Sequence, residues 1–450
     1  MTVDPFAVSL PFARPRKEPY PAAPAWFPVA ALGAGCVAAV AVPDNRPGLG
    51  TLLAILAIAA ALLPVVRLTR SDRMLAALLL ALLAMVVVRD AEWLVVLDLL
   101  AVGGLGTWVL AGARSWPALA AAGVTIWARL FPALPYLARP LSRGDRAAWR
   151  PALRGGRIAV VLVLVFGALF ASADVAFASI AGRLVPSAGL LPVRIVMGLF
   201  VTALVGAGLL THLRPLVPPS LPEPAARPRA EWAVPVLALD ALFAAFVLVQ
   251  LTVLFGGHAH VLRTSGLTYA EYAREGFFQL VVAALLALGV VGYVARVARD
   301  RLLARVSLGT LLALVLVVLA SAWKRLALYE SAYGLTRLRL FVHAVIVGLA
   351  LVVIAVLVAG IRWNGAWLPR TVVAIGAVTL LGLNVANPDA LIARRAVQRF
   401  HAGAEVDRAY LATLGADAVP ALRPLDPAAC SRVEPDSWLA WNLARSRARC

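Results

Sequence analysis

The sequence has little of what a water-soluble protein needs. Only 14% of its 450 residues are charged and 62% are apolar, whereas a soluble domain has about a quarter charged and about half apolar residues. Its three cysteines, Cys36, Cys430 and Cys450, are too few for a fold built on a disulfide framework or for a zinc site made only of thiolates. The composition therefore predicts a protein that lies in a lipid bilayer.

Recognised catalytic patterns are missing as well. The sequence has no Gly-x-Ser-x-Gly, no His-Glu-x-x-His and no kinase-like set of motifs. Gly256-Gly257 follows an apolar run but lacks the lysine and hydroxyl of a phosphate-binding loop. His258 and His260 would need two further ligands to hold a metal ion, and we interpret them as part of a solvated loop. We therefore expect no cofactor and no metal site.

Acidic residues are scarce relative to basic ones. The chain has 42 Lys+Arg against 23 Asp+Glu, which gives a formal net charge of +19. The cations occur singly or in small groups between long apolar runs, not as one basic stripe on a soluble surface. Membrane proteins mark their cytoplasmic side in this way, so we expect anionic lipid and not nucleic acid as the partner of these charges.

Eleven apolar runs approach the length of about 20 residues that a helix needs to cross the hydrocarbon of a bilayer. They predict an all-α fold, a polytopic transmembrane helix bundle. A twelfth run, 116–137, contains Arg129 and two prolines, and we interpret it as an interfacial or re-entrant helix, with a span as the alternative. The eleven expected spans are residues 25–42, 48–66, 74–88, 94–112, 158–182, 195–212, 234–256, 278–297, 308–323, 340–361 and 369–385.

The runs fall into two halves, 25–212 and 234–385. Between them, residues 213–233 are rich in proline, which cannot continue a helix, so we expect an extended linker there. Residues 1–24 are also rich in proline and do not resemble a cleaved signal peptide. We expect them to form a disordered cytoplasmic N-terminus.

The positions of the cations predict the sidedness of the chain. With the N-terminus in the cytoplasm, the cytoplasmic connections carry 23 Lys+Arg and the opposite loops carry 10. The positive-inside rule then predicts a cytoplasmic N-terminus in the plasma membrane, and eleven spans place the C-terminus outside. The basic loop 113–157 contains the segment 138–157, which suits anionic lipid headgroups.

The last segment, 386–450, is charged and lacks a long apolar run. Its residues 387–389, Asn-Pro-Asp, are typical of a helix start, and Gly403 can end that helix. Further short helices are expected around 405–414 and from Asp417. We therefore expect a small helical C-terminal domain.

The cysteines fit this topology in more than one way. If the C-terminal domain lies outside the cytoplasm, Cys430 and Cys450 face an oxidising compartment and could pair, with two unpaired thiols as the alternative. Cys36, in the first expected span, is interpreted as a small packing residue.

Five stretches of the sequence carry a family resemblance. They are ASADVAF (171–177), LFAAFVLVQLTVLFGG (242–257), LTYAEYAREGFFQL (267–280), LALYESAYGLTRLRL (326–340) and YLATLGADAVPAL (410–422). In order and spacing they resemble a bacterial family of integral membrane proteins known as the domain of unknown function 4153/4173 group. The resemblance implies a multi-pass membrane protein with a helical tail, and it supplies no catalytic roles.

Few ionisable residues fall inside the expected spans. Each costs roughly 2.5–3.5 kcal/mol on insertion and is by default a candidate site. Asp98, Asp174 and His343 fall in the outer half of the membrane, whereas Asp240 lies near the cytoplasmic end of its span. Asp174 is also interpretable as a buried packing residue that is paired with Arg337 or with a backbone donor.

Two polar connections, 258–277 and 324–339, are expected on the outer side. Their carboxylate, guanidinium and phenol groups predict an outward-facing cavity that suits an anionic or sugar-bearing ligand. The alternatives are ordinary interface anchors and an ion pair within one helix. The candidate binding residues are Asp174, Glu271, Arg274, Glu275, Tyr329, Glu330, Tyr333, Arg337 and Arg339.

Three functions are compatible with these features. The first is an envelope-associated sensor or assembly protein that contacts another envelope protein. The second is a transporter or lipid-handling protein whose intramembrane polar residues line a path. The third is a membrane-embedded enzyme that uses a carboxylate of the outer connections on a lipid-linked anionic substrate. We favour the first, because no span has the density of polar groups that transport or catalysis requires.

Overall fold

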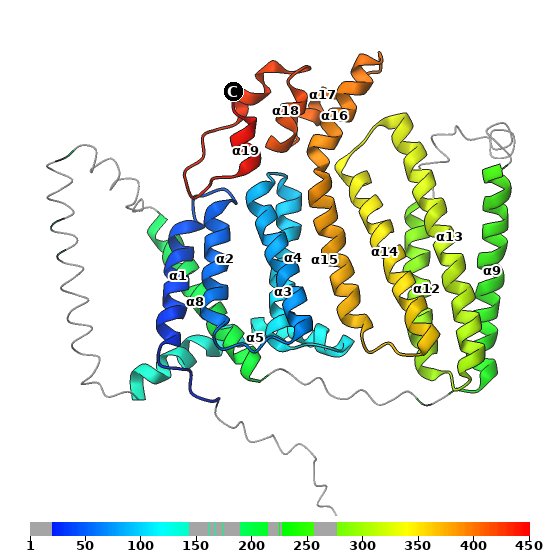
Figure 1. Cartoon of the computed structure of the whole chain (residues 1–450), viewed down its shortest axis with the longest axis horizontal. Coiled ribbons are helices and arrows are strands. Elements are labelled where there is room, and N and C mark those ends of the chain that lie inside the picture. The colour runs from blue at the N-terminus through cyan, green and yellow to red at the C-terminus, as the bar shows by residue number, and fades with distance from the viewer. Residues whose placement is uncertain are drawn as a thin grey trace, which may run out of the picture.

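Long apolar helices that stand side by side make up most of the molecule (Figure 1). Every regular element in the part of the chain that the computed structural model describes is a helix. Inside a bilayer the backbone must satisfy its own hydrogen bonds, and an apolar helix does so within one segment. The predicted all-α fold is therefore confirmed. The described residues are 20–143, 190–214, 227–255 and 277–450, together with Leu162, Phe166, Asp174 and Ala225.

The helices account for ten of the eleven expected spans. Nine helices in the described residues are long and apolar enough to cross a membrane, and the chain is a multi-pass membrane protein. Eight of the nine coincide with expected spans, and the ninth, Trp116–Ala138, is the twelfth run, for which a span was the alternative. The expected span 158–182 lies outside the described residues, apart from three isolated positions. The helices of the bundle are α1 (Phe27–Ala41), α2 (Leu49–Leu62), α3 (Arg70–Val88), α4 (Glu92–Ala111), α5 (Trp116–Arg143), α8 (Leu191–Leu213), α9 (Arg229–Phe255), α12 (Phe277–Val297), α13 (Arg301–Tyr333), α14 (Arg337–Arg362) and α15 (Leu368–Ala386).

Two helices are shorter than the apolar runs that predicted them. α1 has 15 residues and α2 has 14, so each is shorter than the roughly 20 residues of a full span. Pro43 follows Val42, the C-cap of α1, and Pro64 follows Leu63, the C-cap of α2. Proline has no backbone N–H to donate to the carbonyl four residues earlier, which explains why both helices stop early.

Helix α13 is longer than predicted. The sequence suggested a span at 308–323 followed by a polar connection at 324–339, but α13 runs without a break over 33 residues to Tyr333. It ends at Gly334, whose φ of 82° is accessible mainly to glycine. Most of the expected connection is therefore helical, and only the residues between α13 and α14 form a turn.

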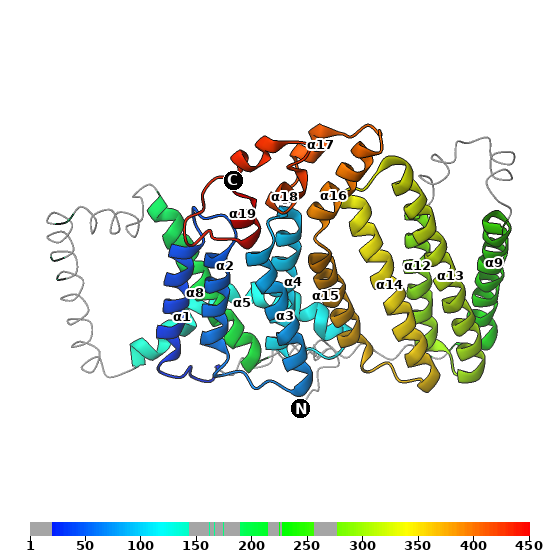
Figure 2. The same cartoon turned by 45° about the horizontal axis from the view of Figure 1, so that its top comes forward.

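The two ends of the bundle differ. Helices α16 to α19 cover one end, which we call the tail end, and residue 20 lies toward the opposite end, which we call the far end (Figures 1 and 2). These helices form the C-terminal domain, residues 387–450. Its elements are α16 (Pro388–His401), α17 (Arg408–Ala412), the 3-10 helix η2 (Ala416–Ala418), α18 (Val419–Leu422), η3 (Pro427–Arg432) and α19 (Leu443–Ala448). The small helical domain expected at the C-terminus is therefore present.

Helix α5 does not run parallel to its neighbours. It lies across the far ends of the bundle helices and packs mainly on α8 (Figures 1 and 2). Trp127 and Phe131 are exposed, whereas Tyr136 is buried. The buried Arg129 donates hydrogen bonds to Leu210 O and to Arg214 O at the end of α8. Arg214 follows the last helical residue, where carbonyl groups lack partners within the helix. This orientation agrees with the interfacial interpretation of residues 116–137.

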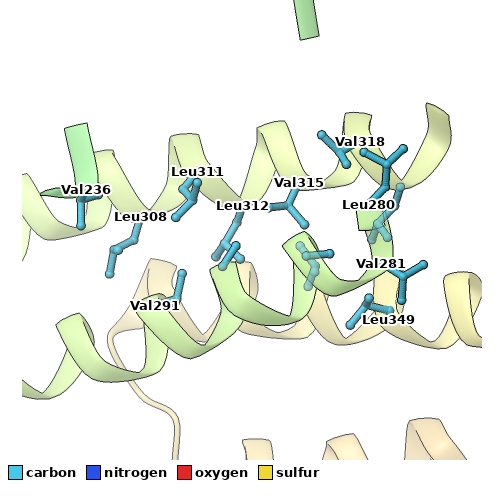
Figure 3. Close-up of a cluster of buried hydrophobic side chains, with 14 of the residues drawn as sticks. Val236, Leu280, Val281, Val291, Leu308, Leu311, Leu312, Val315, Val318 and Leu349 are labelled. Atoms are coloured by element: carbon cyan, nitrogen blue, oxygen red, sulfur yellow. The ribbon is translucent and has the colours of Figure 1, made fainter. Parts of the chain in front are cut away.

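The bundle has separate cores that one helix connects. Helices α9, α12, α13 and α14 share a core to which Val236, Leu311 and Leu349 contribute (Figure 3). A second core lies among α1, α2, α5 and α8. Helix α15 packs on α14 at one side and on α3 at the other, so it connects the two sets of helices.

The expected linker is shorter than the proline-rich segment. Helix α8 ends at Leu213, but α9 begins at Arg229 and includes Pro235 near its start. Residues 229–233 are thus helical and do not belong to an extended linker. Most of the remaining linker lies outside the described residues.

Helices α1 and α8 approach closely at Gly35. A Cβ atom placed on Gly35 would lie 2.5 Å from Gly198 O and would also overlap Thr202 Oγ1. A Cβ placed on Gly33, in the same helix, would meet nothing within 4 Å. Such close approach of small residues is a common way for helices to pack in membranes. Gly35 is therefore required for the contact, whereas Gly33 is not.

We predict that Gly35→Ala lowers the free energy of unfolding by about 1–3 kcal/mol, because the added methyl group overpacks the contact between α1 and α8. The thermal unfolding of the purified protein in detergent measures this change. Gly33→Ala is the matched control and should leave the unfolding temperature unchanged. The same loss in both variants would contradict the assigned contact.

Candidate functional site at the tail end of the bundle

Ionic contacts concentrate where the C-terminal domain meets the bundle, and we call this region the docking interface. It begins at Asn387, which is the single residue between α15 and α16. Asn387 has a φ of 52°, and its side chain accepts a hydrogen bond of 3.4 Å from Ala390 N. This N-cap starts α16 as the Asn-Pro-Asp sequence predicted. The domain is thus attached directly to the end of a transmembrane helix.

Arg337 and Asp389 form the central ion pair of the docking interface. Arg337, at the start of α14, donates from Nε to Asp389 Oδ1 at 2.9 Å and from Nη2 to Oδ2. Asp389 is fully buried, and Gly415 N donates to its Oδ2 at 2.8 Å. The Arg337 backbone N–H also donates to the Tyr410 hydroxyl at 2.9 Å. A buried carboxylate with a bidentate arginine partner is a strong and specific contact.

A second group joins the turn between α3 and α4 to the domain. Arg89 Nη1 donates to Asp417 Oδ1 at 3.3 Å, and Asp90 N donates to Asp417 Oδ2 at 2.7 Å. In return, Ala416 N donates to Asp90 Oδ2 at 3.1 Å. Burial raises the pKa of the Asp417 carboxyl, whereas the hydrogen bond from Asp90 N–H and the Arg89 guanidinium lower it. These partners offset the cost of burying the carboxylate.

The end of the chain completes the docking interface. Arg445, which is nearly fully buried, binds Asp436 through two contacts of 2.9 Å from Nε and also pairs with Asp90. The Asn442 amide donates to Arg89 O at 2.8 Å and to Val86 O at 3.1 Å. Val86 lies in the last turn of α3 and Arg89 follows it, so neither carbonyl group has a backbone N–H partner within the helix. The domain therefore supplies hydrogen bonds that the bundle lacks.

The same segment also caps α2. Leu49 N donates to Trp441 O at 3.0 Å, and Gly50 N donates to Leu439 O at 2.6 Å. The first N–H groups of a helix have no partner within it. Contacts to the start of α2, the end of α3 and the start of α14 thus hold the domain on three separate helices.

A buried polar pair lies inside the bundle below this interface. The Asn384 amide of α15 donates to Asp98 Oδ1 of α4 at 2.8 Å, and both side chains are fully buried. Among the described residues, Asp98 Oδ2 and Asn384 Oδ1 have no hydrogen-bond partner. The backbone carbonyl of Asn384 accepts from Arg89 Nε at 2.8 Å. The intramembrane acid is therefore connected through Asn384 and Arg89 to Asp417 of the domain.

Several predicted site residues meet at the corner between α13 and α14. His343 Nδ1 lies 3.1 Å from Glu330 Oε1, and its ring packs edge-on against Trp323 at 4.2 Å. The Arg339 guanidinium lies 4.2 Å from the centre of the Tyr329 ring. The corner therefore combines a carboxylate, a histidine and an arginine on an aromatic ring.

Other predicted residues do not join this corner. The Tyr333 ring lies tilted against that of Tyr329, with ring centres 4.9 Å apart, but Tyr333 is exposed. Arg337 binds Asp389 of the C-terminal domain, and the interpretation that Asp174 is a packing residue stays a prediction. Asp240 is buried in α9, a helix that belongs neither to this corner nor to the docking interface.

The remaining predicted residues cannot be placed in the site. Glu271, Arg274, Glu275, His258 and His260 lie outside the described residues. Asp174 is described only as an isolated, exposed position. The outward-facing cavity predicted from these residues therefore remains a prediction.

Chemically, the docking interface is built to hold the domain. Its carboxylates are engaged by arginine side chains or by backbone N–H groups. Within the described residues, no three His, Cys, Asp or Glu side chains are grouped so that they could hold a metal ion. The arrangement fixes one position of the C-terminal domain on the bundle, and the buried pairs contribute more to it than the exposed ones.

Sequence reasoning missed most of the docking interface. Asp389 was interpreted only as part of a helix start, and Asp417 only as the start of a short helix. The pairing of Arg337 with Asp389 joins residues 52 positions apart, and that of Arg89 with Asp417 joins residues 328 apart. One signal was present, because Arg337 and Asp417 both lie in stretches that carry the family resemblance.

A comparison with known protein families shows a match. The family model described as "Domain of unknown function (DUF4153)" matches residues 74–425. The matched range begins well before the stretches that carried the resemblance, and it includes most of the bundle and the Arg337–Asp389 pair. No curated protein and no solved structure matches the chain.

We predict that Arg337→Ala destabilises the docked domain by about 3–5 kcal/mol, because the variant leaves the buried Asp389 charge without its partner. The rate at which protease cuts the C-terminal domain in purified protein measures the change. Arg46→Ala is the matched control, because Arg46 also bridges bundle and domain but its 2.9 Å pair with Glu434 is exposed. We expect about 0–1 kcal/mol for that variant, and equal losses in the two would contradict the assigned role of Arg337.

Proposed function

Because the chain belongs to the family of domain of unknown function 4153, whose description states no activity, we propose its role from the docking interface. We propose that it is an envelope-associated sensor or assembly protein. In this role the C-terminal domain contacts another envelope protein, and the bundle responds to that contact. The observation that carries the proposal is the continuous set of contacts from Asp98 inside the bundle to Asp417 in the domain.

This set of contacts supports coupling between the domain and the bundle. Moving the domain away would expose Asp417 and Asp389 to water and would release Arg89 and Arg337. Arg89 also holds the carbonyl of Asn384, the residue that binds Asp98. A partner that shifts the domain would therefore disturb the packing of α15 on α4, which is what a sensor of this kind requires.

Two observations support a plasma-membrane orientation with the C-terminal domain outside the cytoplasm. Connections on the side of the N-terminus carry 23 Lys+Arg against 10 in the opposite loops. In addition, Cys430 and Cys450 form a disulfide bond, with Cα atoms 5.4 Å apart. Disulfides persist in oxidising compartments. Anionic headgroups of the cytoplasmic leaflet would then contact the basic segment 138–157.

The described polar residues favour a sensor over a transporter. Asp98 pairs with Asn384 and His343 lies beside Glu330, whereas Asp240 lies in a third region of the bundle. Among the described residues, no hydrogen bond or ion pair joins these groups to one another. A transport path would need polar groups that follow one another across the membrane.

We predict that a reporter enzyme that is active only after export is active when fused after Cys450. The same reporter fused after Asn364, in the turn between α14 and α15 at the far end, is the control and should be inactive. Activity in the cytosol of a reporter fused after Cys450 would overturn the proposed orientation and the proposed contact with an envelope partner.

The sensor role is tested with Arg89→Lys, which keeps the positive charge but removes the planar group that binds Asn384 O and Asp417 together. We expect cells that carry this variant to lose resistance to envelope stress while the amount of protein in the membrane stays normal. Arg46→Lys at the exposed pair is the matched control and should behave as the wild type.

One further variant separates the sensor from the membrane-embedded enzyme. Glu330→Gln removes a candidate general base but leaves the docking interface intact, so we expect normal growth under the same stress. Loss of function in Glu330→Gln together with normal function in Arg89→Lys would contradict the proposal and favour the enzyme.

A further inference from the structure

A groove of about 350 Å³ opens between α12, α13 and α14 near the far end of the bundle. It is separate from the docking interface, which lies at the tail end. Its walls are mainly apolar and include Leu308 and Leu312 of α13 and Val356 of α14. A volume above about 300 Å³ between helices of a bundle is in the range of ligand sites.

The groove is open because glycine lines it on two helices. A Cβ atom placed on Gly309 of α13 or on Gly360 of α14 would meet nothing within 4 Å. Both glycines border the groove, together with the small side chains of Ala295 and Ala359. A larger residue at either glycine would therefore extend into the groove without a clash with the backbone.

Polar groups lie at the far-end mouth of the groove. Arg305, near the start of α13, and Asn364, after the end of α14, both line it. Arg305 has no ion-pair partner among the described residues, and the only hydrogen bond of the Asn364 side chain is accepted by its Oδ1 from Ala366 N. The guanidinium of Arg305 and the amide NH₂ of Asn364 are thus available as donors.

The surrounding charge is strongly positive. The segments 296–305 and 362–364, which flank the mouth, contain five arginines and one acidic residue, Asp300. Asp300 is engaged by Arg229 at 2.6 Å. Basic pockets between transmembrane helices bind the headgroups of anionic lipids, and the mouth of this groove has that character.

We propose that the groove binds one anionic phospholipid of the leaflet at the far end of the bundle. The acyl chain lies along Leu308, Leu312 and Val356, and the phosphodiester accepts hydrogen bonds from Arg305 and Asn364. The occupant is a lipid because the apolar part of the groove lies in the membrane-spanning part of the helices, and it is anionic because the mouth is basic. This site goes beyond the proposed sensor role and does not depend on it.

Native mass spectrometry of the full-length protein tests the site. The protein is reconstituted in vesicles of phosphatidylcholine with a minor share of phosphatidylglycerol, then extracted in mild detergent. We expect the wild type to retain one phospholipid and to select phosphatidylglycerol over phosphatidylcholine. Arg305→Ala should retain a lipid but lose about fivefold in selectivity, because one arginine near the surface contributes about a factor of that size.

The acyl-chain part of the site has its own variants. Gly309→Leu and Gly360→Leu fill the groove from opposite helices, and each should abolish retention of both lipids. Gly103→Leu is the matched control, since a Cβ at Gly103 in α4 also meets nothing within 4 Å but lies outside the groove. Arg301→Ala is the control for charge, because Arg301 also lies near the start of α13 but does not line the groove.

Three outcomes would overturn the site. The first is wild-type retention in both groove-filling variants. The second is a loss of retention in Gly103→Leu as large as in Gly309→Leu. The third is displacement of the bound species by inorganic phosphate alone, which would show that the basic mouth binds a free anion and that no acyl chain holds it. A normal unfolding temperature in at least one groove-filling variant would show that the loss of bound phospholipid is due to the filled groove and not to misfolding.

Discussion

At the docking interface, ion pairs between the bundle and the C-terminal domain replace the hydration of their charged side chains. Asp389 and Asp417 of the C-terminal domain are buried where it meets the bundle, and each is compensated by an arginine of the bundle and by a backbone N–H group. Removing charges from water is costly, and the cost is recovered only when the partners are well placed. The position of the whole domain therefore depends on the fit of a few charged side chains.

The domain and the bundle also complete each other through backbone hydrogen bonds. Residues 439–442 form hydrogen bonds with the start of α2 and the end of α3. Asn387 follows α15 and caps the start of α16. Helix ends that emerge from a bilayer still need partners for their terminal N–H and C=O groups. Part of the C-terminal domain meets this need, and these hydrogen bonds hold it against the tail end of the bundle.

The sequence allowed the membrane fold to be predicted well, because a chain in lipid has few options other than apolar helices. Helix ends were predicted where a local residue determines them, as at Asn387 and Gly403. The end of α13 is not predicted, because the polar residues after position 323 suggest a loop, whereas the helix continues to Tyr333 and stops at Gly334. The docking interface could not be predicted, because its pairs join distant parts of the chain and depend on how the helices are arranged.

The connection between α15 and α16 has a mechanical consequence. Helix α15 is packed between α3 and α14, and a single residue with positive φ separates it from α16. A connection of one residue allows α15 and α16 little independent movement. If the two groups of transmembrane helices tilt relative to each other, α15 must tilt with them, and α16 then turns a small rotation within the bilayer into a larger sideways displacement above its surface.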